Sequence, residues 1–261
     1  MLYRELAPVS TNAWEEMDER AAEVLRTTLS ARKVVKVNGP KGIEFSAITE
    51  GRLGETKEEG KVCFGNYNVQ PLTESRIEFE IERWELDNIE RGAKDVELAP
   101  LEEALKELAL FEDNAVFNGL EQACIKGLSE FDKGLSFGNN SKEIMESVLN
   151  GVLKLRENYA VGAYTLVVGE EAYKRVLSQE GGGYPLNKRL EALIEGKIVF
   201  SRAVKGAYLI PYDHDDLELT IGKDFSIGYQ NHTAEKVRFF ATESFTFRVL
   251  DPGIVVKYNL K

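Results

Sequence analysis

The residues best suited to catalysis or metal binding are two histidines and the carboxylates that surround one of them. His214 stands in Asp213-His214-Asp215-Asp216, whereas His232 lies in the polar stretch Gln230-Asn231-His232-Thr233. Zinc ligands come from spaced positions whose side chains converge on one point. Four consecutive turn residues point in different directions, so a solvated turn is the favoured interpretation. We therefore predict no catalytic residue and no metal site.

Other signs of enzyme chemistry are weak. Gly181-Gly182-Gly183 is followed by Tyr184-Pro185 and not by the Gly-Lys-Ser/Thr of a phosphate loop. Cys63 and Cys124 are far apart in sequence and lack metal-ligand spacing. We expect two reduced thiols, with Cys124 packed near the apolar stripe of a helix. The sequence predicts a structural or binding protein and not an enzyme.

Three further side chains have a structural and a functional interpretation. Glu112 and Asp113 are neighbours on a predicted helix, where adjacent positions diverge, so they do not form an acid–base pair. Glu112 follows an apolar residue by one turn, and we predict that it is partly buried and paired with an arginine. Trp84 ends a predicted strand, and it is interpreted as a core or interface anchor. The alternative is a platform on which a flat ligand stacks.

The elements that would position these residues follow from periodicity. A capping box at Asn12-x-x-Glu15 predicts a helix with an apolar stripe that reaches Thr28. The stripe from about 100 to 125 predicts a long helix that acts as the spine of its domain. Alternation predicts a half-buried strand at 75–84 and an unusually long strand at 237–249. A short strand-like alternation is also expected at Ile43-Glu44-Phe45.

Between these elements the chain reads as a compact α/β unit. Asn140-x-x-Glu143 is a second capping box, followed by apolar residues at helical spacing. Helices are predicted at 170–178 and 186–193, and strands at 165–168, 198–200 and 207–211. Residues 50–72 lack such periodicity and contain several glycines. They predict a long exposed hairpin or loop, which in compact domains is usually functional.

Composition limits the classes of function. The chain has 261 residues and a formal net charge of −11, which disfavours a nucleic-acid-binding surface. The sequence has no apolar run of membrane-spanning length, and its charged N-terminus differs from a signal peptide. We expect a cytoplasmic protein with no membrane partner.

Several motifs, in order along nearly the whole chain, resemble the family 1 encapsulin shell proteins, the linocin-like group. The resemblance implies an α+β Hong Kong 97 phage-capsid-like fold with a peripheral domain, an axial domain and an extended loop. The motifs are Leu6-Ala7-Pro8, Arg32-Lys33, Gly39-Pro40, Trp84-Glu85-Leu86-Asp87-Asn88-Ile89-Glu90-Arg91-Gly92, Phe111-Glu112-Asp113, Phe117-Asn118-Gly119, Lys126-Gly127-Leu128, Tyr184-Pro185-Leu186, Asp224-Phe225-Ser226-Ile227-Gly228-Tyr229 and Glu243-Ser244-Phe245-Thr246-Phe247.

The same resemblance implies a division of the chain. Residues 1–49 would form the N-terminal helix and the start of the peripheral domain, and 50–74 the extended loop that reaches a neighbour. Residues 75–133 would be the peripheral domain with its spine helix. Residues 134–222 would be the axial domain, and 223–261 would return to the peripheral domain.

For function, the resemblance implies a shell subunit of an encapsulin nanocompartment in the cytoplasm. Such subunits assemble into an icosahedral cage, here most simply a T=1 shell. The cage encloses a ferritin-like ferroxidase or a dye-decolorizing peroxidase through a C-terminal targeting peptide of the cargo. The alternatives are a phage or prophage major capsid protein and, less favoured, a protease or bacteriocin.

Site residues are also implied by the resemblance. The cargo peptide would lie in a groove of apolar pockets between the N-terminal helix and a strand, oriented by an arginine. A glycine-rich loop would line a pore, and Trp84 matches a tryptophan that stacks a flavin in some relatives, although no cofactor is required. Lys36 replaces a carboxylate found in some relatives. The implied peptide-binding residues are Val24, Leu25, Leu29, Arg32, Ile227 and Tyr229, and the implied pore-lining residues are Gly181, Gly182, Gly183 and Tyr184.

Overall fold

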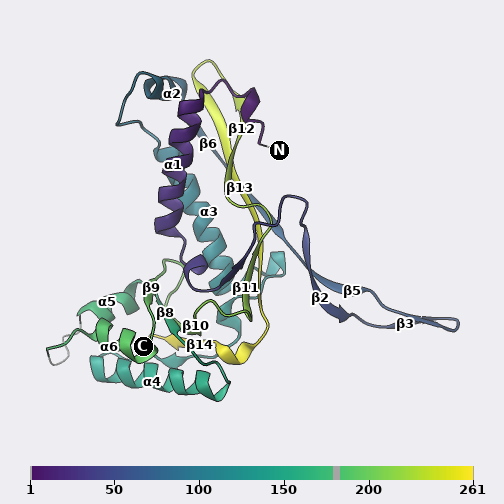
Figure 1. The fold of residues 1–261 in the computed structure, drawn as a ribbon, viewed down its shortest axis with the longest axis vertical. Helices are drawn as coiled ribbons and strands as arrows, with labels where there is room; N and C mark the ends of the chain where they lie inside the picture. Colours follow the sequence, from purple (N-terminus) through teal and green to yellow (C-terminus); the bar gives the residue numbers. More distant parts are fainter. Residues whose placement is uncertain (1, 179–182, 261) are drawn as a thin grey trace.

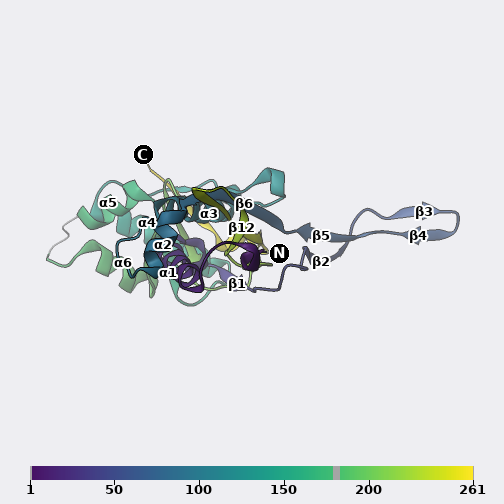
Figure 2. The same cartoon turned by 90° about the horizontal axis from the view of Figure 1, so that it is seen from above.

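The computed structural model describes residues 2–178 and 183–260 as two packed units with a protruding arm. The taller unit holds α1, α2 and α3 beside long strands, and the other unit holds α4, α5 and α6 around short strands (Figure 1). Seen from above, the arm extends away from the body as a thin two-stranded ribbon (Figure 2). No helix in the described ranges is long and apolar enough to cross a bilayer.

One long strand organises the sheet of the taller unit. β13 (Lys236–Val249) pairs antiparallel with β6 (Thr73–Glu82) on one side and with β12 (Ser226–His232) and β11 (Leu217–Ile221) on the other. β1 (Lys36–Asn38) adds in parallel to β11. The predicted long strand and the predicted half-buried strand are thus both confirmed. Their apolar residues are buried because helices cover this side of the sheet.

The helices of this unit differ from the sequence prediction at their ends. α1 (Thr11–Thr28) begins after Ser10, whose side chain accepts a hydrogen bond from Ala13 N, so the predicted Asn12 cap is wrong. α3 (Ala99–Asn118) is also shorter than predicted. It ends at Gly119, which has a positive φ of 86° that suits glycine. Beyond it the chain turns back through a 3₁₀ helix at Glu121–Ala123.

The other unit encloses a second five-stranded sheet. Its order is β7-β14-β10-β8-β9, and every residue of β8 (Tyr164–Val168) and β10 (Ala207–Pro211) is buried. Asn140 caps α4 as predicted, accepting a hydrogen bond from Glu143 N. The elements that complete the unit are α4 (Ser141–Glu157), α5 (Glu170–Ser178), α6 (Leu186–Ile194), β7 (Leu135–Ser136), β9 (Ile198–Phe200) and β14 (Val256–Asn259).

The two units exchange segments in a way that the predicted boundaries do not reproduce. β11 belongs to the sheet of the taller unit, although 217–222 was assigned to the axial domain. β14 pairs with β10 in the second sheet, so residues 223–261 do not all return to the first unit. Hydrophobic patterning identifies strands but not their partners, which explains both differences. The remaining 3₁₀ helices are Arg4–Leu6, Ala31–Lys33, Leu128–Glu130 and Pro252–Ile254.

The aperiodic stretch forms the arm, as a long exposed hairpin. β2 (Ala47–Leu53) pairs with β5 (Tyr67–Pro71), and β3 (Lys57–Glu59) pairs with β4 (Val62–Phe64) nearer the tip. Strand begins at Ala47, whereas 43–45 is a turn or coil, so the short strand predicted there is wrong. Nearly every arm residue is exposed, and a two-stranded ribbon is marginally stable alone in water. The arm therefore needs a partner surface.

A buried carboxylate joins the two units. Asp113 on α3 accepts hydrogen bonds from Ser30 N at 3.0 Å and from Ala31 N at 2.8 Å. Ser30 Oγ also donates to Asp113 and lies 2.8 Å from Ser201 Oγ of the second unit. Burial raises the pKa of Asp113 from 3.8 to about 6, against the opposing effect of these hydrogen bonds.

Because the pKa of Asp113 is raised in the folded chain, the difference in unfolding free energy between the wild type and Asp113→Asn depends on pH. The folded chain holds the Asp113 proton more tightly, so this carboxyl adds stability below pH 3.8 that is lost as the pH rises through about 6. A shift of about 2 pH units corresponds to about 3 kcal/mol. The free energy of unfolding of the wild type, relative to the variant, should fall by up to that amount between pH 4 and pH 7. Urea unfolding at matched protein concentration measures it, and a pH-independent difference would contradict this assignment.

Candidate functional site

A groove between α1, α3 and β12 is the best candidate for a binding site. Its cavity has a volume of about 470 Å³, and its walls are mainly apolar. Leu25 and Ile227, both predicted from the sequence, come together in it. The full lining is Leu2, Arg4, Asp18, Ala21, Ala22, Leu25, Leu105, Phe225, Ser226 and Ile227.

The other predicted peptide-binding residues lie around this groove and not in its lining. Val24 is 8% exposed and packs into the core beneath α1. Leu29 is 7% exposed at the C-terminal end of the same helix. Tyr229 is partly buried two residues beyond Ile227 on β12, and its hydroxyl hydrogen bonds with His232 Nδ1. Peptide binding by these residues stays a prediction.

Arg32 is already engaged by three carboxylates of its own chain. Its guanidinium bonds to Glu112 at 2.6 Å, Asp224 at 2.7 Å and Glu243 at 3.2 Å. It also stacks over the Phe225 ring, 4.6 Å from the centroid. The prediction that Glu112 pairs with an arginine is confirmed, although Glu112 is fully buried and not partly so. Arg32 thus anchors the groove wall.

Arg32 carries one positive charge but contacts three carboxyl groups, two of which are fully buried. Glu243 on β13 is fully buried, and its Oε1 has no hydrogen-bond partner among the described residues. Burial raises the pKa of Glu243 well above its ordinary value, and the nearby negative charge of Glu112 raises it further. Burial therefore favours the neutral form of Glu243, and the shortest contact of Arg32 is with Glu112.

The groove has a polar end that the sequence reading missed. Arg4 makes two 2.7 Å hydrogen bonds to the Asp18 carboxylate, donates through Nε to Ile227 O, and lies over the Trp14 ring. A sequence signal for the helix side did exist. Asp18, Ala21 and Leu25 are three and four residues apart, so they share one helix face. The contact with Arg4 depends on how the N-terminal segment folds back, which has no periodic signal.

Trp84 lies outside the core. β6 ends at Glu82, and Trp84 is instead on α2 (Arg83–Glu90), where it is 70% exposed. Trp84 is therefore not a core anchor, and its role as an interface anchor stays a prediction. The Arg91 guanidinium lies 5.2 Å from the centroid of its ring. Flavin stacking stays a prediction: the indole and one cation are present, but a ring stacked there would remain open to solvent within one subunit.

The predicted pore loop is only partly described. Gly181 and Gly182 lie outside the described residues. Gly183 and Tyr184 are exposed just before α6, which lies on the side of the body opposite the arm (Figure 1). Their lining of a pore stays a prediction.

The candidate residues for metal binding and nucleophilic chemistry do not assemble into a site. Within residues 2–178 and 183–260, no group of three or more His, Cys, Asp or Glu side chains is arranged to hold a metal ion. Lys36 lies 3.6 Å from Asp213 and 3.7 Å from Asp215, which partly neutralises that turn. Cys124 is exposed after the end of α3, so the expectation of a packed helical thiol is wrong.

One further motif has the spacing of a serine nucleophile. Gly134-Leu135-Ser136-Phe137-Gly138 matches Gly-x-Ser-x-Gly. In the structure Ser136 ends β7, and α4 begins only at Ser141, so the sharp strand-to-helix elbow is missing. The motif therefore lacks the geometry of a nucleophile elbow.

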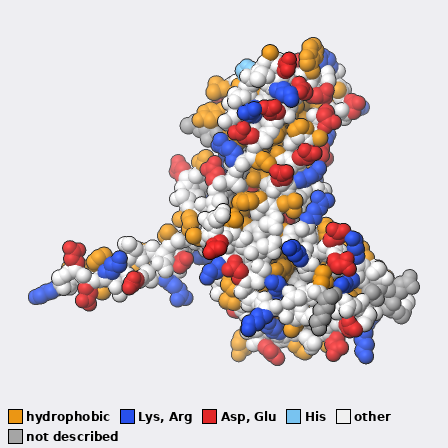
Figure 3. Space-filling model, turned by 180° about the vertical axis from the view of Figure 1, so that it is seen from behind, with side chains coloured by type: hydrophobic (Ala, Val, Ile, Leu, Met, Phe, Trp, Pro, Cys, Tyr) orange, Lys and Arg blue, Asp and Glu red, His pale blue; other side chains and the backbone are white. Residues whose placement is uncertain are grey.

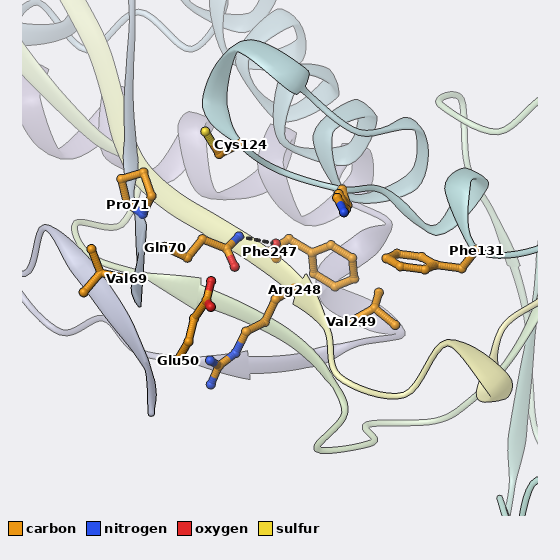
Figure 4. Close-up of a pocket in the computed structure, with 10 residues that line it drawn as sticks. Glu50, Val69, Gln70, Pro71, Cys124, Phe131, Phe247, Arg248 and Val249 are labelled. Carbon is orange, nitrogen blue, oxygen red and sulfur yellow. Dashed lines mark hydrogen bonds between the residues drawn. The ribbon is translucent and has the colours of Figure 1, made fainter. Parts of the chain in front are cut away.

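A second cavity, of about 350 Å³, lies at the base of the arm (Figure 4). Gln70 on β5 donates to Phe247 O at 2.7 Å and to Thr246 Oγ1 at 3.0 Å, which fastens the arm to β13. Phe131, Phe247 and Val249 supply apolar walls. This attachment fixes the direction in which the arm leaves the body.

The chain is similar over its whole length to proteins of one family. The family model described as "Encapsulating protein for peroxidase" matches residues 1–246. The type 1 encapsulin shell protein of Rhodospirillum rubrum is 37% identical, over 98% of this chain and 95% of the relative. The type 1 encapsulin shell protein of Mycobacterium tuberculosis is 32% identical, over 94% of each. Both relatives are named as shell proteins, which agrees with the prediction that this chain is not an enzyme.

Solved structures agree on the fold. The virus-like particle protein of Pyrococcus furiosus superposes with a TM-score of 0.71 at 17% identity, over 94% of this chain and 98% of that chain. The capsid protein of Myoviridae phage XM1 superposes with a TM-score of 0.58 at 12% identity, over 86% and 89%. The expected phage-capsid-like α+β fold is confirmed.

The structural role of Arg32 is tested by Arg32→Met. Removing the guanidinium leaves the buried Glu112 carboxyl without its cationic partner, which should destabilise the chain by about 3–5 kcal/mol. Adding Glu112→Gln should recover much of this loss, because an amide at this position needs no cationic partner. Arg20→Ala, which breaks a half-exposed pair with Glu102, is the control and should cost about 1 kcal/mol or less. Urea unfolding at fixed protein concentration measures all of them, and equal losses for Arg32→Met and Arg20→Ala would refute the role.

Proposed function

The chain belongs to the encapsulin family of shell proteins, and from this premise we propose that it is a structural subunit of a self-assembling protein compartment. The observation that carries the proposal is the full-length match to shell proteins at more than 30% identity, joined to a phage-capsid-like fold. A match to only part of the relatives would not show that the two proteins share the same overall role. Here the relatives and the chain cover one another almost completely.

The surface of the single chain supports assembly. Leu53, Val62, Phe64, Tyr67 and Val69 are all 45% or more exposed on the arm. Charged side chains of both signs are interspersed on the body and arm (Figure 3). A marginally stable ribbon that exposes these apolar side chains gains stability when a second copy covers it. The arm is therefore the first contact that the proposed assembly requires.

The geometry of such contacts favours a closed cage. A contact between the arm of one copy and the body of the next is heterologous, so it closes only at angles that a point group allows. We propose an icosahedral shell of the simplest T=1 kind, located in the cytoplasm. The net charge of −11 disfavours a packaged genome, so cargo protein is preferred over nucleic acid.

The proposed cargo is an enzyme held inside by its own C-terminal tail. The family description names a peroxidase, and a ferritin-like ferroxidase is the second candidate. The groove supports this proposal because it joins an apolar cavity to a sheet edge at β12, and extended peptides bind such edges through main-chain hydrogen bonds. No flavin is required for this role, and stacking of one on Trp84 is a secondary proposal.

A phage capsid remains the alternative, because phage capsid proteins share the fold. Electron microscopy of the purified chain separates the two. We expect uniform hollow particles without nucleic acid. Failure to form particles under several conditions would count against both, and particles filled with nucleic acid would favour the capsid.

The role of the arm in assembly is tested by Phe64→Ser with Tyr67→Ser. Both side chains are exposed in the single subunit, so the substitutions should leave its fold intact and remove apolar contact area between copies. Most of the protein should move from the particle peak to the subunit peak in size-exclusion chromatography. Lys57→Ser with Lys61→Ser, on the same hairpin, is the matched control and should still form particles. Intact particles from both variants would exclude the arm as an essential contact.

The groove is tested by Leu25→Asp. A carboxylate placed in the apolar wall must be desolvated by any bound peptide, and we expect at least about a tenfold loss of co-purified cargo. Arg26→Asp on the exposed side of α1 is the matched control and should load normally. The readout is the mass ratio of cargo to shell after co-expression with a peroxidase that carries its own C-terminal tail. Equal loading by the two variants would exclude this groove.

A further inference from the structure

The N-terminal segment of the chain, residues 2–6, lies against β12. Leu2 O accepts a hydrogen bond from Tyr229 N at 2.8 Å, and Arg4 Nε donates to Ile227 O at 2.8 Å. Both views show the chain start beside the end of this strand (Figures 1 and 2). Leu2 and Arg4 also form part of the lining of the groove. The segment therefore covers the strand edge and one side of the cavity together.

The covered positions are those that an added peptide strand would use. β12 pairs with β13 and ends the strand order of its sheet in the described part of the chain. Ile227 and Tyr229 are two residues apart, so the main-chain groups that they do not use for pairing with β13 point to the same, outer side of the strand. An extended peptide binds an edge by bonding to such alternate residues. The N-terminal segment occupies these hydrogen bonds without being a regular strand.

The segment is held by few contacts. Its 3₁₀ helix, Arg4–Leu6, has no buried residue, and Leu6 is 69% exposed. Tyr3 has a positive φ of 52°, a conformation that costs energy for a residue with a side chain. Arg4 supplies the main attachment, through Asp18 and the face of Trp14. A segment with so little buried surface opens locally at low cost.

We propose that residues 2–6 are a displaceable cover over the binding groove, released when an extended peptide takes its place on β12. This inference rests on the proposed function and adds a regulation of the same site. When Arg4 leaves, Asp18 loses its partner at the polar end of the groove. The incoming peptide therefore has apolar residues for the walls of the cavity and one lysine or arginine that replaces Arg4 on Asp18.

The cover lowers the apparent affinity of the groove for a peptide, because only the fraction of molecules with an open groove can bind it. If the groove is open about a tenth of the time, the peptide binds about tenfold more weakly than it would to a free groove. The cover also makes binding selective during assembly. Only a peptide with apolar residues and a cation for Asp18 displaces a segment that is tethered to the site. Removing the tethered competitor should raise capture of every peptide that uses the β12 edge.

The test uses the complete shell and two fluorescent fusion proteins. One fusion ends in the C-terminal tail of the candidate cargo peroxidase, and the other ends in Leu-Tyr-Arg-Glu-Leu-Ala-Pro-Val, which is residues 2–9 of this chain. Each is co-expressed, at limiting amount, with wild-type shell, with Arg4→Ala and with a shell that lacks residues 2–6. Arg26→Ala, on the exposed side of α1 and outside the lining of the groove, is the matched control for loss of a positive charge.

We expect the shells with Arg4→Ala or without residues 2–6 to capture about tenfold more of the cargo-tail fusion than the wild type or Arg26→Ala at limiting concentration. The fusion that carries residues 2–9 should be captured by the shell that lacks its own segment and not by the wild type. If the deletion prevents assembly, Arg4→Ala carries the test, with faster amide exchange of Tyr229 as its second readout. Equal capture by all shells, with unchanged amide exchange of Tyr229, would overturn the proposal that residues 2–6 cover the groove. Capture of neither fusion by any shell would instead contradict the proposed groove function.

Discussion

The buried ion cluster around Arg32 is the interaction on which the rest of the structure depends. One guanidinium meets Glu112 from α3 and Glu243 from β13, while the adjacent Asp113 holds the backbone that follows α1. Three segments that are remote in sequence are thereby fixed at one point. Because unpaired buried charge costs several kcal/mol, alternative arrangements of these segments are strongly disfavoured. The cluster specifies geometry more than it adds stability, since an apolar replacement of similar shape can be equally stable.

That rigid point contrasts with two weakly held parts. The arm is fastened at its base by Gln70 and is exposed beyond it, and the N-terminal segment is fastened mainly by Arg4. Both depend on a few polar contacts and bury little surface. Regions of this kind are the ones that rearrange when a partner binds. The chain thus keeps its shape at the junction of its units and leaves its contacts with other molecules to its least stable parts.

The sequence predicts the elements of this fold better than their partners. The long strand at 236–249 and the capped helix after Asn140 follow from periodicity, because each is a local pattern. The end of α3 was placed too far along because Leu120 and Ala123 continue its apolar spacing, whereas Gly119 ends the helix. The strand pairing of β11 and β14 has no local signal. The same limit applies to the groove: Leu25 and Ile227 were predicted to lie in it, but Arg4 depends on a contact between residues 223 positions apart.

Edge strands connect the solubility of the single subunit to its proposed binding role. A free β edge such as that of β12 recruits any extended chain, so it promotes aggregation unless something covers it. A permanent cover would abolish binding, and no cover would leave the subunit exposed before assembly. A short segment with one charged anchor satisfies both demands, because it fills the main-chain hydrogen bonds of Ile227 and Tyr229 while burying little apolar surface. The apolar cavity then adds the selectivity that main-chain bonding lacks, since only a peptide with suitable side chains gains from displacing the cover.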